Sequence, residues 1–157
     1  MQKHLPLLLV ILFSACVSSR PGASSYQTGQ ADPAMNELAV YAISLAGTPY
    51  KYGGMSPESG FDCSGFVGHV FKQTLGESLP RSTAEISRRG VKLDEDSLLP
   101  GDLVFYNTLN RSYSHVGIYL GDGQFIHSPS TGKSVTVVNM NESYWRKRYN
   151  GARRIKP

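Results

Sequence analysis

Two kinds of side chain in this sequence are suited to nucleophilic chemistry, a single cysteine and a pair of histidines. Cys63 is the only cysteine after residue 16 and lies in "SGFDCSGFVGHVF" (59–71), where an apolar pattern with helical spacing begins. The amides at the first turn of a helix have no intrahelical acceptor, so a helix that begins at Cys63 favours a thiolate over a thiol. The amides of Cys63 and Ser64 are also suited to bind the oxyanion of a tetrahedral intermediate. Taken alone, this position fits a reactive thiol and a buried structural cysteine equally well.

A thiol that attacks an amide needs a general base, and histidine suits that role best. The chain has four histidines. His4 belongs to the apolar N-terminal segment. His69 follows Cys63 by six residues, which places it roughly 240° around a helix and ~9 Å along it, so it points away from the thiol. His115 and His127 remain as candidates.

His115 and His127 flank a predicted hairpin, "HVGIYLGDGQFIH" (115–127). Side chains alternate between the faces of a strand, so the turn decides whether the two rings can meet. A two-residue turn would place them on opposite faces. A three-residue turn at 121–123 would pair Gly117 with His127 and place His115 on the same face, one diagonal step away. We predict the three-residue turn, because only this register lets His127 orient His115 as the base.

Cys63, His115 and His127 are also a chemically adequate set of zinc ligands. They lack the short paired spacing of metal sites, however, and no acidic residue is an obvious general base. We therefore expect neither a metal nor a cofactor.

The elements that must position these side chains change in character along the chain. Helical patterns come first and strands follow, which predicts an α+β fold with helices packed on an antiparallel sheet of about five strands. Ser82 and Glu85 have the spacing of a capping box at the start of the third helix. The predicted helices begin near residues 34, 63 and 82, and the predicted strands are 102–107, 115–121, 124–128, 134–140 and 151–155.

The first residues, "MQKHLPLLLVILFSAC" (1–16), have the layout of a signal peptide: a basic start, a short apolar run and small residues at the end. The run is about half of the ~20 residues that cross a bilayer. Its "FSAC" ending resembles a bacterial lipoprotein box, which predicts a signal peptide at 1–15 and lipidation of Cys16. The alternative is a secretory signal with an incidental cysteine. Residues 16–33 are rich in Ser, Gly, Pro and Gln, which predicts a flexible tether.

The charge balance is modestly basic, with a formal net charge of +4. This balance suits an anionic envelope polymer or lipid surface, although a solvated basic face explains it as well. The sequence has no glycine loop for phosphate and no nucleic-acid-binding motif, so we expect no nucleic-acid partner. We expect a monomer.

Five blocks in order together resemble the NlpC-type cell-wall cysteine peptidases, and most of all the NlpC and Spr lipoproteins of Gram-negative bacteria. The resemblance runs from about Leu38 to Ile155. The blocks are "GTPYKYGGMSPESGFDCSGFVGHVF" (47–71), "LPRST" (79–83), "LLPGDLVFY" (98–106), "SHVGIYLGDGQFIHSPSTG" (114–132) and "YWRKRYNGARRI" (144–155).

The resemblance implies a papain-like domain over residues 34–157 that hydrolyses amide bonds in peptidoglycan stem peptides. It implies Cys63 as the nucleophile, His115 as the general base and His127 as the residue that orients it. Tyr50 matches a tyrosine near the family's site that assists the oxyanion or the substrate. The segment before Cys63 is one residue longer than in Spr-like chains, so Tyr52 is an alternative to Tyr50.

The sequence leaves the reaction open in two respects. The same three residues would serve an amidase or an acyltransferase, and a non-catalytic lipoprotein that binds wall peptides is a third possibility. Within a peptidase, the bond is γ-D-glutamyl–diaminopimelate in a stem or D-alanyl–diaminopimelate in a cross-link, and no residue decides between them. We expect the protein at the periplasmic face of the envelope, anchored through Cys16 to the outer membrane.

Overall fold

The computed structural model describes residues 32–156; the predicted signal peptide, Cys16 and nearly all of the predicted tether lie outside this range. Helix α1 (Pro33–Ser44) begins where Asp32 caps it, because the Asp32 carboxylate accepts a hydrogen bond from the amide of Ala34. Pro33 occupies the first turn, where its missing N–H costs nothing. The helix ends at Ser44, three residues before Gly47.

Helix α2 (Cys63–Leu75) has the bounds that the sequence predicts. Asp62 caps its first turn, and Gly76 ends it in the left-handed conformation, with φ of 69°. A short hairpin of β1 (Met55–Ser56) and β2 (Gly60–Phe61) leads into it. The third predicted helix is a single turn, α3 (Thr83–Ile86), and its capping box is confirmed by the hydrogen bond from the Glu85 amide to the Ser82 hydroxyl.

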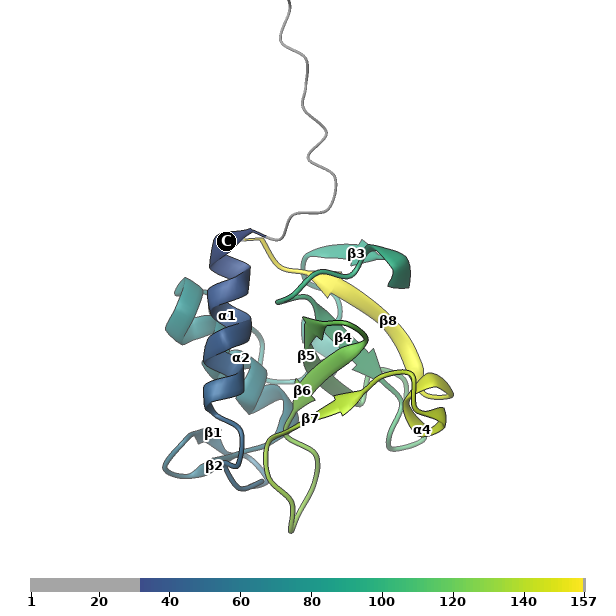
Figure 1. Cartoon of the computed structure of the whole chain (residues 1–157). Helices are drawn as coiled ribbons and strands as arrows, with labels where there is room; N and C mark the ends of the chain where they lie inside the picture. Colours follow the sequence, from purple (N-terminus) through teal and green to yellow (C-terminus); the bar gives the residue numbers. More distant parts are fainter. Residues whose placement is uncertain (1–31, 157) are drawn as a thin grey trace, which may run out of the picture.

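The main sheet is antiparallel and has six strands rather than about five, in the order β3-β8-β4-β5-β6-β7 (Figure 1). The additional strand is the short edge strand β3, which follows α3 closely and whose three residues give too short a pattern to recognise. A 3-10 turn (Glu95–Ser97) and helix α4 (Ser143–Arg146) lie between strands. The strands are β3 (Val91–Leu93), β4 (Leu103–Tyr106), β5 (His115–Gly121), β6 (Gln124–His127), β7 (Thr136–Asn139) and β8 (Tyr149–Arg154). The predicted α+β class is confirmed.

The hairpin between β5 and β6 has the predicted register but not the predicted turn. Ile118 pairs with Ile126, which puts Gly117 opposite His127 as expected. The turn itself has two residues, Asp122 and Gly123, both with positive φ, as a type I′ turn requires. A bulge between Tyr119 and Gly121 takes up the extra residue. The prediction of a three-residue turn was therefore wrong, because a bulge restores the same register.

Each face of the sheet has its own hydrophobic cluster. On one face α1 and α2 pack against side chains such as Phe105, Val116 and Ile118. On the other face the cluster around Tyr106 and Phe125 is covered by Trp145 of α4. Alternate residues of β5 thus serve opposite faces, and His115 belongs to the face that α4 covers.

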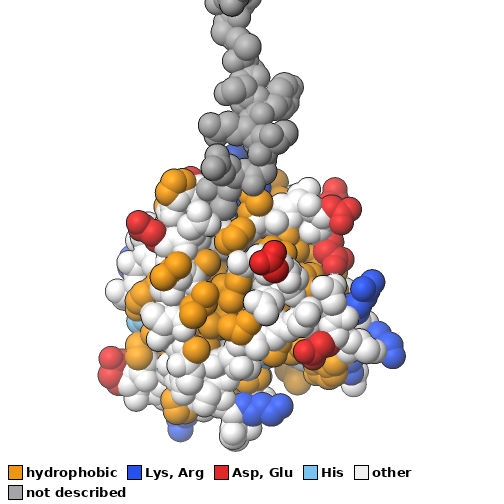
Figure 2. Space-filling view, in the orientation of Figure 1, with side chains coloured by type: hydrophobic (Ala, Val, Ile, Leu, Met, Phe, Trp, Pro, Cys, Tyr) orange, Lys and Arg blue, Asp and Glu red, His pale blue; other side chains and the backbone are white. Residues whose placement is uncertain are grey.

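The surface carries an uneven distribution of side chains. Figure 2 shows hydrophobic side chains gathered over the middle of one face, with Lys and Arg toward its edges. On α1, Val40 and Ile43 are exposed. Within residues 32–156, no helix has both the length and the apolar character needed to span a membrane.

Candidate active site

The start of α2 is built around the carboxylate of Asp62. One oxygen accepts the amide of Gly65 at 2.7 Å, which caps the helix, and the other accepts the amide of Gly53 at 3.0 Å. Arg81 donates to the same carboxylate and also to the hydroxyl of Ser64, at 2.7 Å. One side chain therefore holds the helix start, the loop before it and the segment that leads to α3.

The surroundings of Asp62 favour the ionised form of its carboxyl group. Burial alone would raise the pKa of the carboxyl, but the hydrogen bonds and charge of Arg81 and the amides of Gly65 and Gly53 outweigh it. The net effect lowers the pKa of Asp62 below its ordinary value. The sequence analysis did not assign a role to Asp62, although its position directly before a helix start is a recognisable capping signal.

The thiol of Cys63 is partly buried at the first residue of α2. Its sulfur lies 3.6 Å from the hydroxyl of Thr83. Burial raises the pKa of Cys63 and the Asp62 carboxylate raises it further, while the Thr83 hydroxyl and the amides of Ser64 and Val116 offset only part of this. The helix-start amide of Ser64 lowers this pKa, as the sequence predicts, but removal from water outweighs it, so the expected net preference for the thiolate is not found.

His115 and His127 are brought together as a pair. The Nε2 atom of His115 lies 2.7 Å from the Nδ1 atom of His127, and the ring planes are nearly perpendicular, at 89°. Both side chains are buried. The bulged register of β5 and β6 produces this contact, since it places both side chains on one face of the sheet.

Trp145 covers this pair from α4. Its ring stacks on His115 with centroids 5.9 Å apart and meets His127 edge-on at 5.0 Å, while the residue itself is only 8% exposed. Burial lowers the pKa of His115 to about 4. Burial, together with the charges of His115 and Lys133, lowers the pKa of His127 to about 3. Both rings are therefore neutral at neutral pH.

If His115 is to act as a base toward Cys63, the neutral state of both rings determines which ring nitrogens of His115 and His127 carry protons. Val116, the residue after His115, belongs to the hydrophobic cluster against which Cys63 packs, so β5 passes close to the start of α2. Since Nε2 of His115 bonds to His127, Nδ1 is the nitrogen left for the thiol. Nε2 then carries the proton and donates to His127 Nδ1, which must be unprotonated. The lowered pKa keeps His127 neutral, and its tautomer with the proton on Nε2 meets this requirement.

Tyr50 is close enough to Cys63 and Asp62 for their charges to act on its hydroxyl. Burial raises the pKa of Tyr50, and the charges of Cys63 and Asp62 raise it further, so its hydroxyl remains a donor at neutral pH. Tyr52 is 87% exposed. The hydroxyl of Ser64 is already engaged by Asp62 and Arg81, which leaves its amide as the group suited to chemistry.

His69 takes no part in the pair of histidines. Its Nε2 lies 3.0 Å from the hydroxyl of Tyr41, and its ring stacks on that tyrosine, so it joins α1 to α2. In residues 32–156, no group of three or more His, Cys, Asp or Glu side chains is arranged to hold a metal ion.

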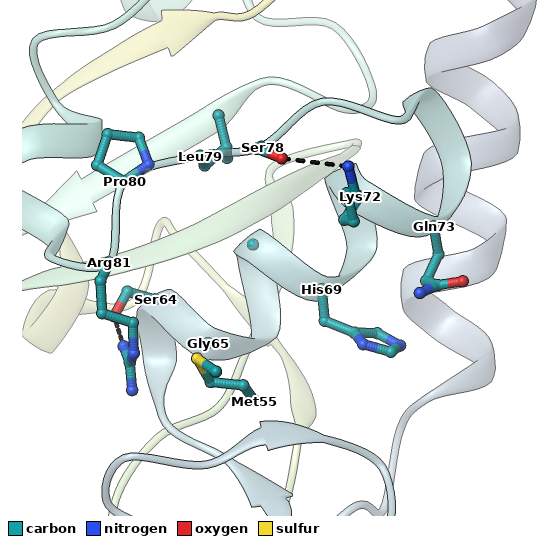
Figure 3. A pocket seen from close by; sticks show the side chains of 11 residues that line it. Met55, Ser64, Gly65, His69, Lys72, Gln73, Ser78, Leu79, Pro80 and Arg81 are labelled. Carbon is teal, nitrogen blue, oxygen red and sulfur yellow. Dashed lines mark hydrogen bonds between the residues drawn. The ribbon is translucent and has the colours of Figure 1, made fainter.

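One cavity lies along α2, and another lies against the paired histidines. The first, of about 410 Å³, runs along α2 and is lined by Ser64, Gly65, Lys72 and Arg81 among others (Figure 3). In Figure 3 Arg81 reaches Ser64 at one end, and Lys72 bonds to Ser78 at the other.

The second cavity, which we call the histidine cavity, has a volume of about 480 Å³. Both His115 and His127 line it, together with Lys133, Glu142 and Trp145 and several polar and apolar neighbours. The sequence analysis missed Lys133 and Trp145. Trp145 is the only tryptophan of the chain, but nothing in its local sequence indicates contact with β5 and β6.

A family model described as NlpC/P60 matches residues 47–154. The chain belongs to the NlpC/P60 family. The match covers α2, β5 and β6 and therefore Cys63, His115 and His127.

Curated relatives of this NlpC/P60 chain are named as enzymes of the cell wall. Murein DD-endopeptidase MepH of Escherichia coli is 41% identical over 125 residues, which are 78% of this chain and 45% of that protein. Murein DD-endopeptidase MepS/Murein LD-carboxypeptidase of the same species is 46% identical over 109 residues, or 69% of this chain and 56% of that protein. The chain thus spans about half the length of these two. It spans nearly all of "Probable endopeptidase NlpC" of E. coli, at 38% identity over 150 residues, 95% of this chain and 96% of that protein.

Solved structures share the fold of this NlpC/P60 chain. A family member from Bacillus cereus has a TM-score of 0.74 at 38% identity and covers 81% of this chain and 42% of its own. The NlpC/p60 domain of the peptidoglycan hydrolase SagA has a TM-score of 0.66 at 35% identity, over 76% of this chain and 98% of that domain.

Proposed function

We propose that this protein is a peptidoglycan endopeptidase that cleaves stem-peptide amide bonds with Cys63 as nucleophile, His115 as general base and His127 as the residue that orients the base. The observation that carries the proposal is the 2.7 Å contact between His115 Nε2 and His127 Nδ1, on a strand whose next residue, Val116, belongs to the hydrophobic cluster against which Cys63 packs. The names of the relatives, murein endopeptidases and peptidoglycan hydrolases, support the substrate class.

In this mechanism the thiol is activated at the moment of attack. Because burial raises the pKa of Cys63 and lowers that of His115, the resting pair is a neutral thiol and a neutral imidazole. The Cys63 sulfur attacks the carbonyl carbon while its proton passes to Nδ1 of His115. The oxyanion that forms is stabilised by the helix-start amides of Cys63 and Ser64 and by the hydroxyl of Tyr50.

The intermediate collapses when the carbon–nitrogen bond breaks. The imidazolium of His115 protonates the leaving amine, and the acyl group stays on Cys63 as a thioester. Water then attacks the thioester, His115 takes the water's proton, and the thiolate leaves and recovers that proton. The product is a carboxylic acid, and the enzyme returns to its starting state.

We further propose the cellular setting from the N-terminal sequence. Residues 1–15 serve as a lipoprotein signal peptide, Cys16 carries the lipid, and residues 16–33 tether the domain of residues 34–157 to the membrane. This arrangement would hold the enzyme at the periplasmic face of the outer membrane, where its substrate lies.

The test is mass spectrometry of purified muropeptides, monomeric and cross-linked, after incubation with the protein and with a Cys63→Ala variant. We expect cleavage products from the intact protein alone, and their masses identify the bond. Products formed equally by both proteins would refute Cys63 as the nucleophile. Muropeptides retained but uncleaved by both would favour a binding protein over an enzyme.

A further inference from the structure

The histidine cavity adjoins His115, where the substrate residue that carries the departing amine would bind. In the proposed mechanism Nδ1 of His115 hands a proton to the departing amine, so that amine must lie against His115. The histidine cavity opens on both His115 and His127, whereas the cavity along α2 is lined by Ser64 and Arg81 and by neither of these histidines. Its volume of about 480 Å³ exceeds that of a single amino-acid residue.

Among residues 32–156, Lys133 is the only lysine or arginine that lines this cavity, and its backbone is held by hydrogen bonds. Its carbonyl accepts the amide of Tyr50 at 2.8 Å, and its amide donates to Ser130 at 3.1 Å. Its ammonium is near enough to His127 for its charge to act on that ring. Over residues 32–156, Lys133 forms no ion pair and no side-chain hydrogen bond, so its charge has no partner in that part of the protein.

Glu142 lines the same cavity and carries the opposite charge, but it forms no ion pair with Lys133. The cavity therefore presents one separate positive and one separate negative charge beside the base. A newly released amino-acid terminus has matching charges, because its carboxylate is anionic and its amine becomes an ammonium near neutral pH.

We propose that Lys133 recognises a free carboxylate on the carbon that bears the leaving amine. This inference rests on the proposed function and narrows its substrate. A D-alanyl–diaminopimelate cross-link meets the requirement, because the acylated amine and a free carboxylate share one carbon of diaminopimelate. A γ-D-glutamyl–diaminopimelate bond within a tetrapeptide stem does not, because the corresponding carboxyl is bound in the next amide.

The experiment compares two cross-linked muropeptides that differ only in this carboxyl, which is free in one and converted to a carboxamide in the other. The full protein is assayed with Lys133→Gln, Lys133→Arg and Lys147→Gln variants. Lys147 is exposed directly after α4 and does not line the cavity, so its variant is matched in charge change. The readout is the ratio of kcat/KM for the carboxylate over the carboxamide, which a general loss of folding would not alter.

We expect the protein to prefer the carboxylate substrate about tenfold, the scale of a hydrogen bond to a charged group. Lys133→Gln should abolish the preference, and Lys133→Arg and Lys147→Gln should retain it. Equal rates on both substrates, a ratio unchanged by Lys133→Gln, or cleavage only at γ-D-glutamyl–diaminopimelate would overturn the inference while the proposed function stands. Cleavage of no muropeptide at all would instead refute the proposed function.

Discussion

Replacement of Asp62 tests whether one carboxylate organises the active site. In Asp62→Ala, the helix cap to Gly65 is lost at a cost of ~1 kcal/mol. The hydrogen bond to the Gly53 amide adds ~1 kcal/mol. The ion pair with Arg81 adds only ~0.5 kcal/mol, because the Arg81 side chain is 45% exposed and screened by solvent. The total is a decrease of about 2.5 kcal/mol in the free energy of unfolding.

The measurement is urea unfolding at pH 7 followed by circular dichroism, with Glu77→Ala as control. Glu77 pairs with Arg89 in an exposed ion pair, so its loss should cost less than ~0.5 kcal/mol. Asp62→Asn keeps an oxygen for the helix cap and should cost about half as much as Asp62→Ala. A loss below ~1 kcal/mol in Asp62→Ala, or one equal to the control, would refute the assigned role of this carboxylate.

Urea unfolding at lower pH gives a second test of the role of Asp62. The pKa of Asp62 is lowered in the folded protein, so its charge stabilises the fold at every pH above the unfolded value of ~3.9. This contribution is lost as the pH falls through the folded-state pKa. The difference in stability between the protein and Asp62→Asn should therefore shrink when the pH is lowered from 5 to 3. A difference that stays constant would show that the charge of Asp62 contributes nothing.

Three further predictions follow from the packing and burial of the site. Gly65→Ala would bring a Cβ within 2.0 Å of the Gly54 carbonyl oxygen, so we expect a loss of ~3 kcal/mol or more, measured by urea unfolding; an unchanged midpoint would contradict the packing. Trp145→Leu would admit water to His115 and raise its pKa from about 4 toward its ordinary value, so the acid limb of the kcat/KM profile, where the base is protonated, should move by about one unit to higher pH. Because burial raises the pKa of Cys63, its alkylation by iodoacetamide should accelerate steadily from pH 6 to pH 9, and a rate already at its plateau at pH 6 would show a preformed thiolate.

The sequence predicted some helix ends correctly, missed one strand and gave the wrong turn between the histidines. The end of α2 follows from Gly76, and the start of α3 follows from Ser82 and Glu85, because capping is local chemistry. Strand β3 was missed, since its three residues are a strand only through their pairing with β8. The register of β5 and β6 was right although the turn was wrong, because a bulge and a two-residue turn together shift the pairing as a three-residue turn does.

The sequence by itself determined which side chains are available for chemistry. A single cysteine before an apolar helix, and two histidines at the ends of a hairpin, identify the candidates because side-chain chemistry and helix capping depend on residues a few positions apart. The pairing of His115 with His127 was also accessible, since strand alternation restricts the possible registers.

The tertiary structure alone decided the electrostatic environment of these side chains. Burial of Cys63 reverses the effect that its helix position would have on the pKa, and Trp145 covers the two histidines from a distant part of the chain. Lys133 reaches the same cavity through a loop held by Tyr50. Desolvation depends on every neighbour in space, and these neighbours come from segments far apart in sequence, so no local pattern encodes it.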